Sequence, residues 1–153
     1  MGSEMCIRDS FKLDQISDLK LRFDTRVWPN FEDGHFCSRY LLSFDNPKVG
    51  FLKSAEYFYR KRVDNSSTLG TSVQQPGRYT DVPRYGYLNA LEIGSEKFGS
   101  PPEWLQNFIL YELSWYFSAE DKASAAASAA SGAVGREFVE LLELISKLSL
   151  IHI

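Results

Sequence analysis

The spacing of apolar residues changes along the chain and divides it into two halves. In residues 11–68 the pattern is mixed: Leu21–Asp24 alternates apolar and polar residues, which predicts a short strand. Val49–Leu52 and Ala55–Tyr59 are rich in apolar and aromatic residues and predict two more strands. Glu32–Phe44 instead carries aromatic residues at every fourth position, which predicts a helix with acids in its first turn. We therefore expect an α/β first half.

The second half is expected to be helical throughout. Residues 69–80 are rich in Ser, Thr, Gly, Gln and Pro, the composition of a linker. Residues 81–147 then predict three helices, the first ending at Gly99, the second opened by Pro101 and the third centred on Phe138–Ile145. The second helix is apolar around most of its circumference, and such a helix is normally buried against partners. We expect these helices to form an appendage to the first half.

The two ends of the chain are related at the level of DNA. Codons for Leu148–Ile153, reverse-complemented and read one base over, encode Met5–Asp9, and the same DNA extended upstream supplies Met1–Glu4. One element read inward from both ends is typical of a sequencing-library adapter. We therefore expect residues 1–10 and 148–153 to be adapter translation, which is excluded from fold reasoning. Residues 11–147 would then be an internal piece of a longer gene from environmental DNA.

Composition excludes several classes of function. Without Arg8, Glu4 and Asp9, the 17 basic and 20 acidic residues become 16 and 18, which gives no electrostatic case for a nucleic-acid partner. One histidine and one cysteine remain, so a multi-histidine zinc site and an internal disulfide are ruled out within residues 11–147. No apolar run approaches the roughly 20 residues that span a bilayer. These features fit a cytoplasmic protein.

The acidic pair Glu32–Asp33 is the sharpest candidate for chemistry. It lies at a predicted strand-to-helix junction, where open α/β sheets place their ligands. Asp33 could act there as a general base that takes a proton from an attacking hydroxyl, with Glu32 fixing its position. The alternative is that both acids only cap free amides and offset the helix dipole. His35 is a candidate for lining the same site, or else a surface or hydrogen-bonded residue.

Arg60 and Arg62 form a second candidate site. They fall on one side of an extended strand, because side chains alternate between the two faces. Two neighbouring guanidinium groups suit a diphosphate, which they can bind through several charge-assisted hydrogen bonds. The alternative is a solvated edge strand protected by basic residues.

Several motifs together resemble one known family. The acidic "ED" motif of family 2 glycosyltransferases is resembled by Phe23–Arg26 followed by Pro29–Phe36. In members that build bacterial capsule or other surface glycans, the next segment is similar to Pro47–Leu52, Tyr59–Arg62 and Asn65–Thr68. A helical region that trails the catalytic domain in some members is similar to Trp104–Tyr111 with Trp115–Phe117.

The resemblance implies that residues 11–68 are the C-terminal part of an A-type glycosyltransferase domain. Such enzymes invert the sugar as they move it from a nucleotide-sugar donor to a hydroxyl of a glycan or lipid-linked acceptor. Asp33 matches the catalytic base, and Arg62 stands where relatives often carry a histidine near the metal and diphosphate. Nucleotide and divalent metal (Mg or Mn) bind to an N-terminal half with an Asp-x-Asp motif, which residues 11–147 lack. We therefore expect the chain to carry no metal ligands and to be inactive alone.

Two alternatives stay open beside this interpretation. The chain could belong to a bifunctional polymerase that also carries a glycerophosphate or polyol-phosphate transferase. It could instead be a non-catalytic interaction module in which Trp104–Phe117 docks on a subunit or a membrane surface, such as the inner face of the cell membrane. If the first half is part of a larger sheet, its strands should be incomplete, and aromatic residues such as Phe23, Phe51 and Tyr57 should be unusually exposed.

Overall fold

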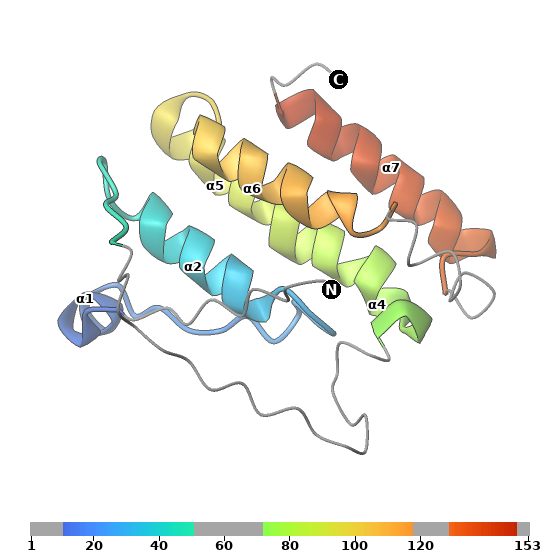
Figure 1. The fold of residues 1–153 in the computed structure, drawn as a ribbon, viewed down its shortest axis with the longest axis horizontal. Helices are drawn as coiled ribbons and strands as arrows, with labels where there is room; N and C mark the ends of the chain where they lie inside the picture. The colour runs from blue at the N-terminus through green and yellow to red at the C-terminus, as the bar shows by residue number, and fades with distance from the viewer. Residues whose placement is uncertain (1–10, 51–71, 118–128, 150–153) are drawn as a thin grey trace, which may run out of the picture.

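The computed structural model describes residues 11–50, 72–117 and 129–149 of the 153-residue chain. All of its regular elements in these ranges are helical (Figure 1). In chain order they are α1 (Leu13–Asp18), α2 (Glu32–Leu42), the 3-10 turn η1 (Ser72–Gln74), α4 (Pro76–Tyr79), the π-helical segment η2 (Val82–Leu88), α5 (Asn89–Phe98), α6 (Glu103–Ser114) and α7 (Gly132–Leu148).

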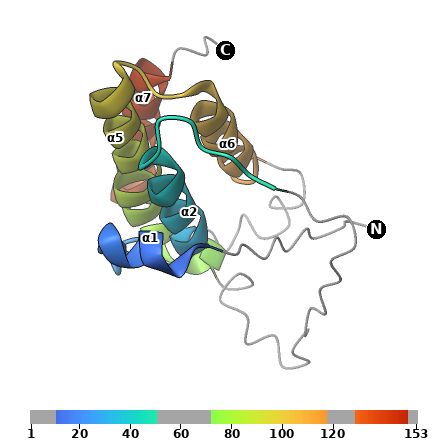
Figure 2. The same ribbon diagram turned by 90° about the vertical axis from the view of Figure 1, so that its left-hand side faces the viewer.

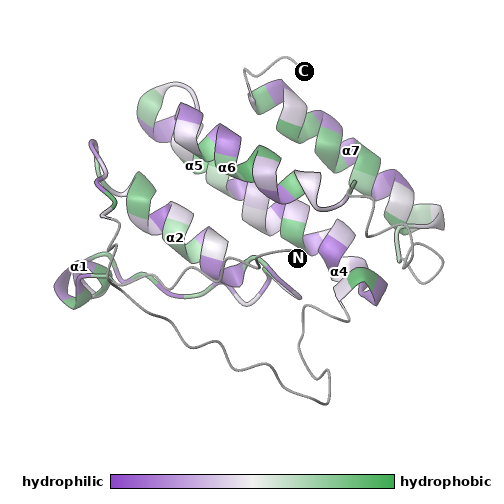
Figure 3. Ribbon diagram, in the orientation of Figure 1, coloured by the Kyte–Doolittle hydropathy of each residue, from purple (hydrophilic) through white to green (hydrophobic). Residues whose placement is uncertain are grey.

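The continuous η2–α5 helix is the centre of the fold. Helices α2, α6 and α7 all pack against α5, and α7 also packs against η2. In Figure 1 the axes of these four long helices are roughly aligned, and α6 runs back alongside α5 in the opposite direction. Figure 2 shows the same helices from the side. Polar and apolar residues are mixed along each of them (Figure 3), as expected for helices that bury one face and leave another in water.

One hydrophobic core joins the two halves that the sequence pattern distinguishes. Val27, Phe31 and Leu42 from the first half belong to the same buried cluster as residues of the later helices. The later members are Val82, Tyr87, Ala90, Leu91, Leu105, Ile109, Leu113 and Ile145. Burial of these side chains is the main favourable contribution to folding.

The prediction of an α/β first half is wrong for the residues that the structure describes. Residues 11–50 contain helices and turns and no strand. Leu21 is buried, but Phe23, which a strand would place on the same face, is 59% exposed. The main-chain carbonyl of Arg22 accepts a long hydrogen bond from the Arg39 side chain, 3.5 Å away, where a strand would pair with a neighbouring strand. A strand is stable only when another strand pairs with its backbone, and the described residues supply none.

The other two predicted strands are only partly covered. Val49 and Gly50 have no regular structure, while 51–52 and 55–59 lie outside the described residues. Phe51 and Tyr57, two of the aromatic residues expected to be exposed, lie outside them as well, whereas Phe23 has the exposure expected of it. The aromatic helix predicted for Glu32–Phe44 is confirmed as α2.

The later helices follow the predicted order. Gly99 ends α5 in the left-handed conformation, with φ +81°, a position that favours glycine. In η2 and α5 the buried residues Val82, Gly86, Ala90 and Gly94 recur at every fourth position. A repeat of four residues is longer than the 3.6 residues of an α-helical turn. The wider π-helical turns of η2 therefore help to keep these residues on one side of the helix.

Segments at two predicted boundaries take part in packing. Residues 72–80, in the predicted linker, contain η1 and α4, and the side chains of Arg78 and Tyr79 are buried. Ser149, in the segment that we expect to be adapter-encoded, is buried too and donates a 3.1 Å hydrogen bond to Gln106 Oε1 on α6.

Candidate functional site

Phe31 determines where the acidic pair at the start of α2 lies. It is the N-cap residue of α2 and adopts the left-handed conformation, with φ 70°, which is strained for a residue with a bulky side chain. This conformation accompanies a ring that packs in the core, 4.6 Å from the Tyr87 ring and 5.6 Å from the Phe108 ring between centroids. A Cβ added at Gly34 would come within 2.5 Å of the Phe31 ring, so a larger residue there would have to displace the ring. The backbone that carries the acids is therefore held tightly.

Glu32 and Asp33 follow Phe31 in the first turn of α2, and both are exposed. The Asp33 carboxylate accepts a 2.7 Å hydrogen bond from the backbone N–H of Gly34, while Phe31 offers no side-chain cap. Asp33 thus satisfies one free amide of the helix, as the capping interpretation expects. Its side chain is also exposed, as a general base that must reach a substrate requires. No hydrogen bond joins Glu32 to Asp33 among the described residues.

Glu112 on α6 is a second carboxyl close to Asp33. Its side chain is half-buried, and burial together with the nearby Asp33 charge raises the pKa of Glu112 to about 7. The neighbouring Arg78 guanidinium opposes this rise and lowers the pKa of Glu112. Acidic residues of α2 and α6 therefore share one electrostatic environment, in which one carboxyl titrates near neutral pH.

Arg78 and two tyrosines form a hydrogen-bonded group beside Glu112. The Arg78 side chain is 8% exposed, donates a 2.7 Å hydrogen bond to Ser72 Oγ, and lies over the Tyr116 ring at 4.7 Å. Tyr116 donates through its hydroxyl to the Arg78 carbonyl at 2.8 Å, and this hydroxyl lies 3.4 Å from that of Tyr87. Burial raises the pKa of both tyrosines, that of Tyr116 to about 12, so both hydroxyls stay protonated. Arg78 Nε is buried without a hydrogen-bond partner among the described residues.

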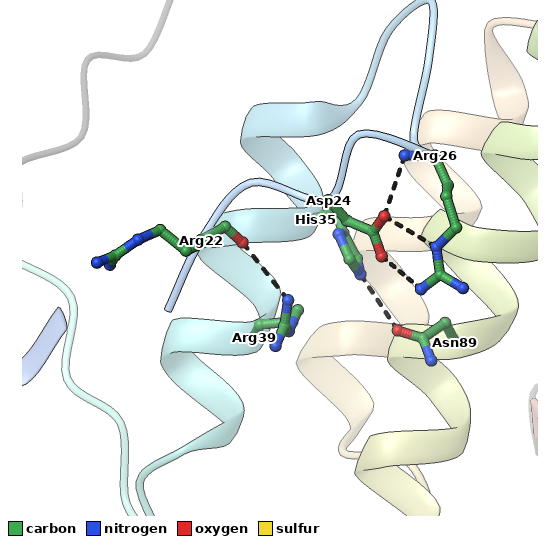
Figure 4. Close-up of polar contacts among 6 residues, drawn as sticks. All are labelled: Arg22, Asp24, Arg26, His35, Arg39 and Asn89. Carbon is green, nitrogen blue, oxygen red and sulfur yellow. Dashed lines mark hydrogen bonds and ion pairs between the residues drawn. The ribbon is translucent and has the colours of Figure 1, made fainter. Parts of the chain in front are cut away.

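His35 lies in the interior and not on the acidic surface. Its side chain is 1% exposed, and Nε2 lies 3.3 Å from Asn89 Oδ1 on α5 (Figure 4). Burial lowers the pKa of His35, which keeps the ring neutral at physiological pH. The structure thus gives His35 a packing and hydrogen-bonding role between α2 and α5, and does not place it with Asp33 at the surface.

Asp24 and Arg26 hold the turn that precedes α2. Figure 4 shows the Asp24 carboxylate accepting hydrogen bonds from both the backbone and the guanidinium of Arg26, the shortest at 2.7 Å. These bonds lower the pKa of Asp24 to about 2. The Arg26 guanidinium also lies over the Tyr85 ring at 4.6 Å. These contacts connect the turn to η2, and the Asp24 and Arg26 side chains are engaged with each other and not available for catalysis.

The remaining predicted site residues cannot be placed. Arg60 and Arg62 lie outside the described residues. Within the described ranges, no group of three or more His, Cys, Asp or Glu is arranged to hold a metal ion. These residues therefore offer no ligand set for the divalent metal that the resemblance implies, and no step is assigned to it.

Nor do the described ranges contain a helix with the length and apolar character needed to cross a bilayer.

Glu112 and Arg78 are site residues that the sequence analysis missed. Glu112 did leave a signal, because it is the lone acid between Trp104 and Phe117, a stretch in which most residues are apolar or aromatic. A charged residue in such a setting is often half-buried and perturbed. Arg78 left none, since it lies in a segment whose composition predicts a linker.

Comparison with known proteins identifies no family for this chain. A scan against protein-family models, a search of curated proteins and a search of solved structures each returned no match.

Proposed function

We propose that this chain carries the catalytic base of an inverting glycosyltransferase that resembles family 2. The observation that supports it is the exposed Asp33 carboxylate, presented on a backbone that the Phe31 ring anchors in the core. A rigidly held base is what proton abstraction in a positioned complex needs. The proposal depends on the ordered motifs and on this geometry, and no longer on a strand-to-helix junction, because residues 11–50 contain no strand.

In the proposed reaction Asp33 accepts the proton of an acceptor hydroxyl. The acceptor oxygen then bonds to the anomeric carbon of the donor sugar, while the bond from that carbon to the diphosphate breaks. Glu32 contributes negative charge beside Asp33, and Arg60 and Arg62 are the proposed contacts of the diphosphate. Donor and metal binding belong, in this proposal, to another part of the enzyme, which acts on glycan or lipid-linked acceptors at the cytoplasmic face of the membrane.

The test is the substitution Asp33→Asn in the intact enzyme that contains this chain. Turnover is measured as release of nucleoside diphosphate from a panel of nucleotide-sugars in the presence of simple glycoside acceptors. Loss of a general base should lower kcat by roughly 10²–10⁴-fold, whereas a changed cap costs only about 0.5–2 kcal/mol of stability. Asp14→Asn, which alters an exposed acid in the first turn of α1, is the matched control and should keep normal turnover. Near-normal turnover of Asp33→Asn would contradict the proposal.

A second function is favoured by exposed aromatic side chains near the end of α6. Tyr111, Trp115 and Phe117 are 53%, 47% and 66% exposed, and the first two rings pack edge to face 5.9 Å apart. Exposed aromatic groups of this kind are common where proteins bind one another. In this alternative the chain is a helical interaction module and Asp33 only caps α2. Asp33→Asn then leaves turnover of the intact enzyme unchanged, while Trp115→Ala abolishes binding of the chain to its subunit or membrane surface.

A further inference from the structure

A hollow of about 460 Å³ lies where the end of α2 meets the turn between α5 and α6. It is lined by Asp45 from the segment after α2, Phe98 at the end of α5, and Glu103 and Trp104 at the start of α6, together with neighbouring prolines. Asp33 lies at the opposite end of α2, in its first turn. A ligand of this hollow is therefore independent of the proposed reaction.

Several contacts hold the walls of the hollow in place. Gln106 is 6% exposed, and its Nε2 donates a 2.7 Å hydrogen bond to the Pro101 carbonyl. On the other side, Lys97 Nζ lies 3.0 Å from the Leu42 carbonyl oxygen and 3.0 Å from the Asp45 carboxylate. These contacts connect α6 to the turn before it and α5 to the end of α2. A ligand would therefore meet a surface that needs little reorganisation, which favours binding.

Two aromatic rings line the hollow, and they differ in what lies over them. Lys97 Nζ is 5.0 Å from the centroid of the Phe98 ring, so the chain already places a cation over one of them. Trp104 is half-buried, and its ring makes no cation–ring or ring–ring contact in the described part of the chain. An indole face attracts a cation more strongly than a phenyl ring does. Trp104 is thus suited to a cationic group of a ligand.

The charged groups in the lining of the hollow are negative. Asp45 and Glu103 are both exposed, and the lining contains no basic residue. Asp45 pairs with Lys97, whereas Glu103 forms no ion pair within the described ranges. A carboxylate and an indole in one hollow match a guanidinium group, which stacks on aromatic rings and binds a carboxylate through two parallel hydrogen bonds. A lysine ammonium lacks this planar shape.

We propose that this hollow binds an arginine side chain from a segment of a partner protein. The guanidinium stacks on Trp104 and pairs with Glu103, while the apolar part of the same side chain contacts Pro101 and Pro102. The occupant is a protein segment because the hollow is open to solvent and covers only part of a ligand, so that a backbone beside the arginine adds contacts along Pro47. Arginine and aromatic residues are enriched where proteins bind one another.

Titration of the isotope-labelled full chain with blocked pentapeptides, followed by NMR, tests this contact. The probe is acetyl-Ala-Ala-Arg-Ala-Ala-amide. The control peptide carries citrulline, which keeps the planar group and removes the charge. Amide signals of residues 98–106 and of Asp45 should shift with the arginine peptide, with a dissociation constant on the order of 1 mM. The citrulline peptide should bind at least about fivefold more weakly, since it loses both the cation–ring contact and the ion pair.

Variants of the two contact residues locate the binding site. Glu103→Gln should weaken binding of the arginine peptide about two- to fivefold, the effect of one exposed ion pair. Trp104→Leu keeps an apolar side chain without the aromatic face and should weaken binding about fivefold. Glu103→Lys, which changes an exposed side chain and leaves the indole in place, should abolish detectable binding. Glu143→Gln removes the same charge from an exposed position on α7, outside the hollow, and should bind as the wild type does.

Three results would overturn the proposal. The first is equal binding of the arginine and citrulline peptides. The second is shifts that map outside residues 98–106 and the segment after α2. The third is unchanged binding of the arginine peptide by Glu103→Lys, which decides the matter even if Trp104→Leu alters the fold. A glutamate peptide that shifts the same signals more strongly than the arginine peptide would likewise contradict the charge complementarity.

Discussion

The half-buried carboxyl of Glu112 should make the stability of this fold depend on pH in a direction opposite to that of most acidic residues. The pKa of Glu112 rises from 4.5 to about 7 in the folded protein, mainly because burial disfavours the charged form. Below pH 4.5 the group is protonated in both the folded and the unfolded chain. Between pH 4.5 and 7 the unfolded chain loses the proton first, so the free energy of unfolding falls as pH rises through this range.

The size of this effect follows from the difference between the two pKa values. A difference of about 2.5 corresponds to about 3 kcal/mol, since each pH unit is worth 1.36 kcal/mol. Part of the carboxyl contacts water, which screens the interaction, so we expect about 2 kcal/mol. Glu112→Gln removes the titration. The free energy of unfolding of this variant, relative to wild type, should therefore increase by about 2 kcal/mol between pH 4.5 and 8.

Urea denaturation of both proteins at several pH values measures this difference. Acidic groups remote from Glu112 titrate alike in the two proteins and cancel, and the amide of glutamine adds an offset that does not change with pH. Glu103→Gln is the control on the same helix, and its difference from wild type should be flat. A flat or decreasing difference for Glu112→Gln would refute the burial of this carboxyl and its proximity to Asp33.

Two further predictions concern the packing of α2. His35 is buried as a neutral ring with a lowered pKa, so its contribution to stability should be lost as pH drops below about 6.5, where the unfolded histidine gains a proton. In urea denaturation, the free energy of unfolding of His35→Gln relative to wild type should therefore be higher at pH 5 than at pH 7, and the titration of Glu112, which both proteins share, cancels in this difference. Gly34→Ala should lower the free energy of unfolding by about 1–3 kcal/mol, because its Cβ would meet the Phe31 ring at 2.5 Å. Gly50→Ala, where nothing lies within 4 Å, is the control, and equal stability of the two variants would contradict the close packing.

The local pattern of the chain was sufficient to predict α2, α5, α6 and α7, but it predicted neither α1 nor α4. Aromatic residues at every fourth position predicted α2, Gly99 predicted the end of α5, and paired prolines predicted the start of α6. These features act through the residue itself and its near neighbours, so they can be read without knowledge of the rest of the fold. The acids of the first turn of α2 were identified in the same way.

Only the tertiary structure decided what the first half becomes and which residues surround Asp33. The alternation of apolar and polar residues at Leu21–Asp24 is compatible with a strand. A strand also needs a neighbouring strand to pair with, and the regular elements of the described residues are all helical. The same dependence on distant contacts applies to charge. Glu112 and Arg78 lie far from Asp33 in sequence, and the charges of Asp33 and Arg78 shift the pKa of Glu112 only because the chain has folded, with Phe108 of α6 against Phe31 at the start of α2. Burial and proximity set their chemistry, and neither quantity exists until the helices have packed.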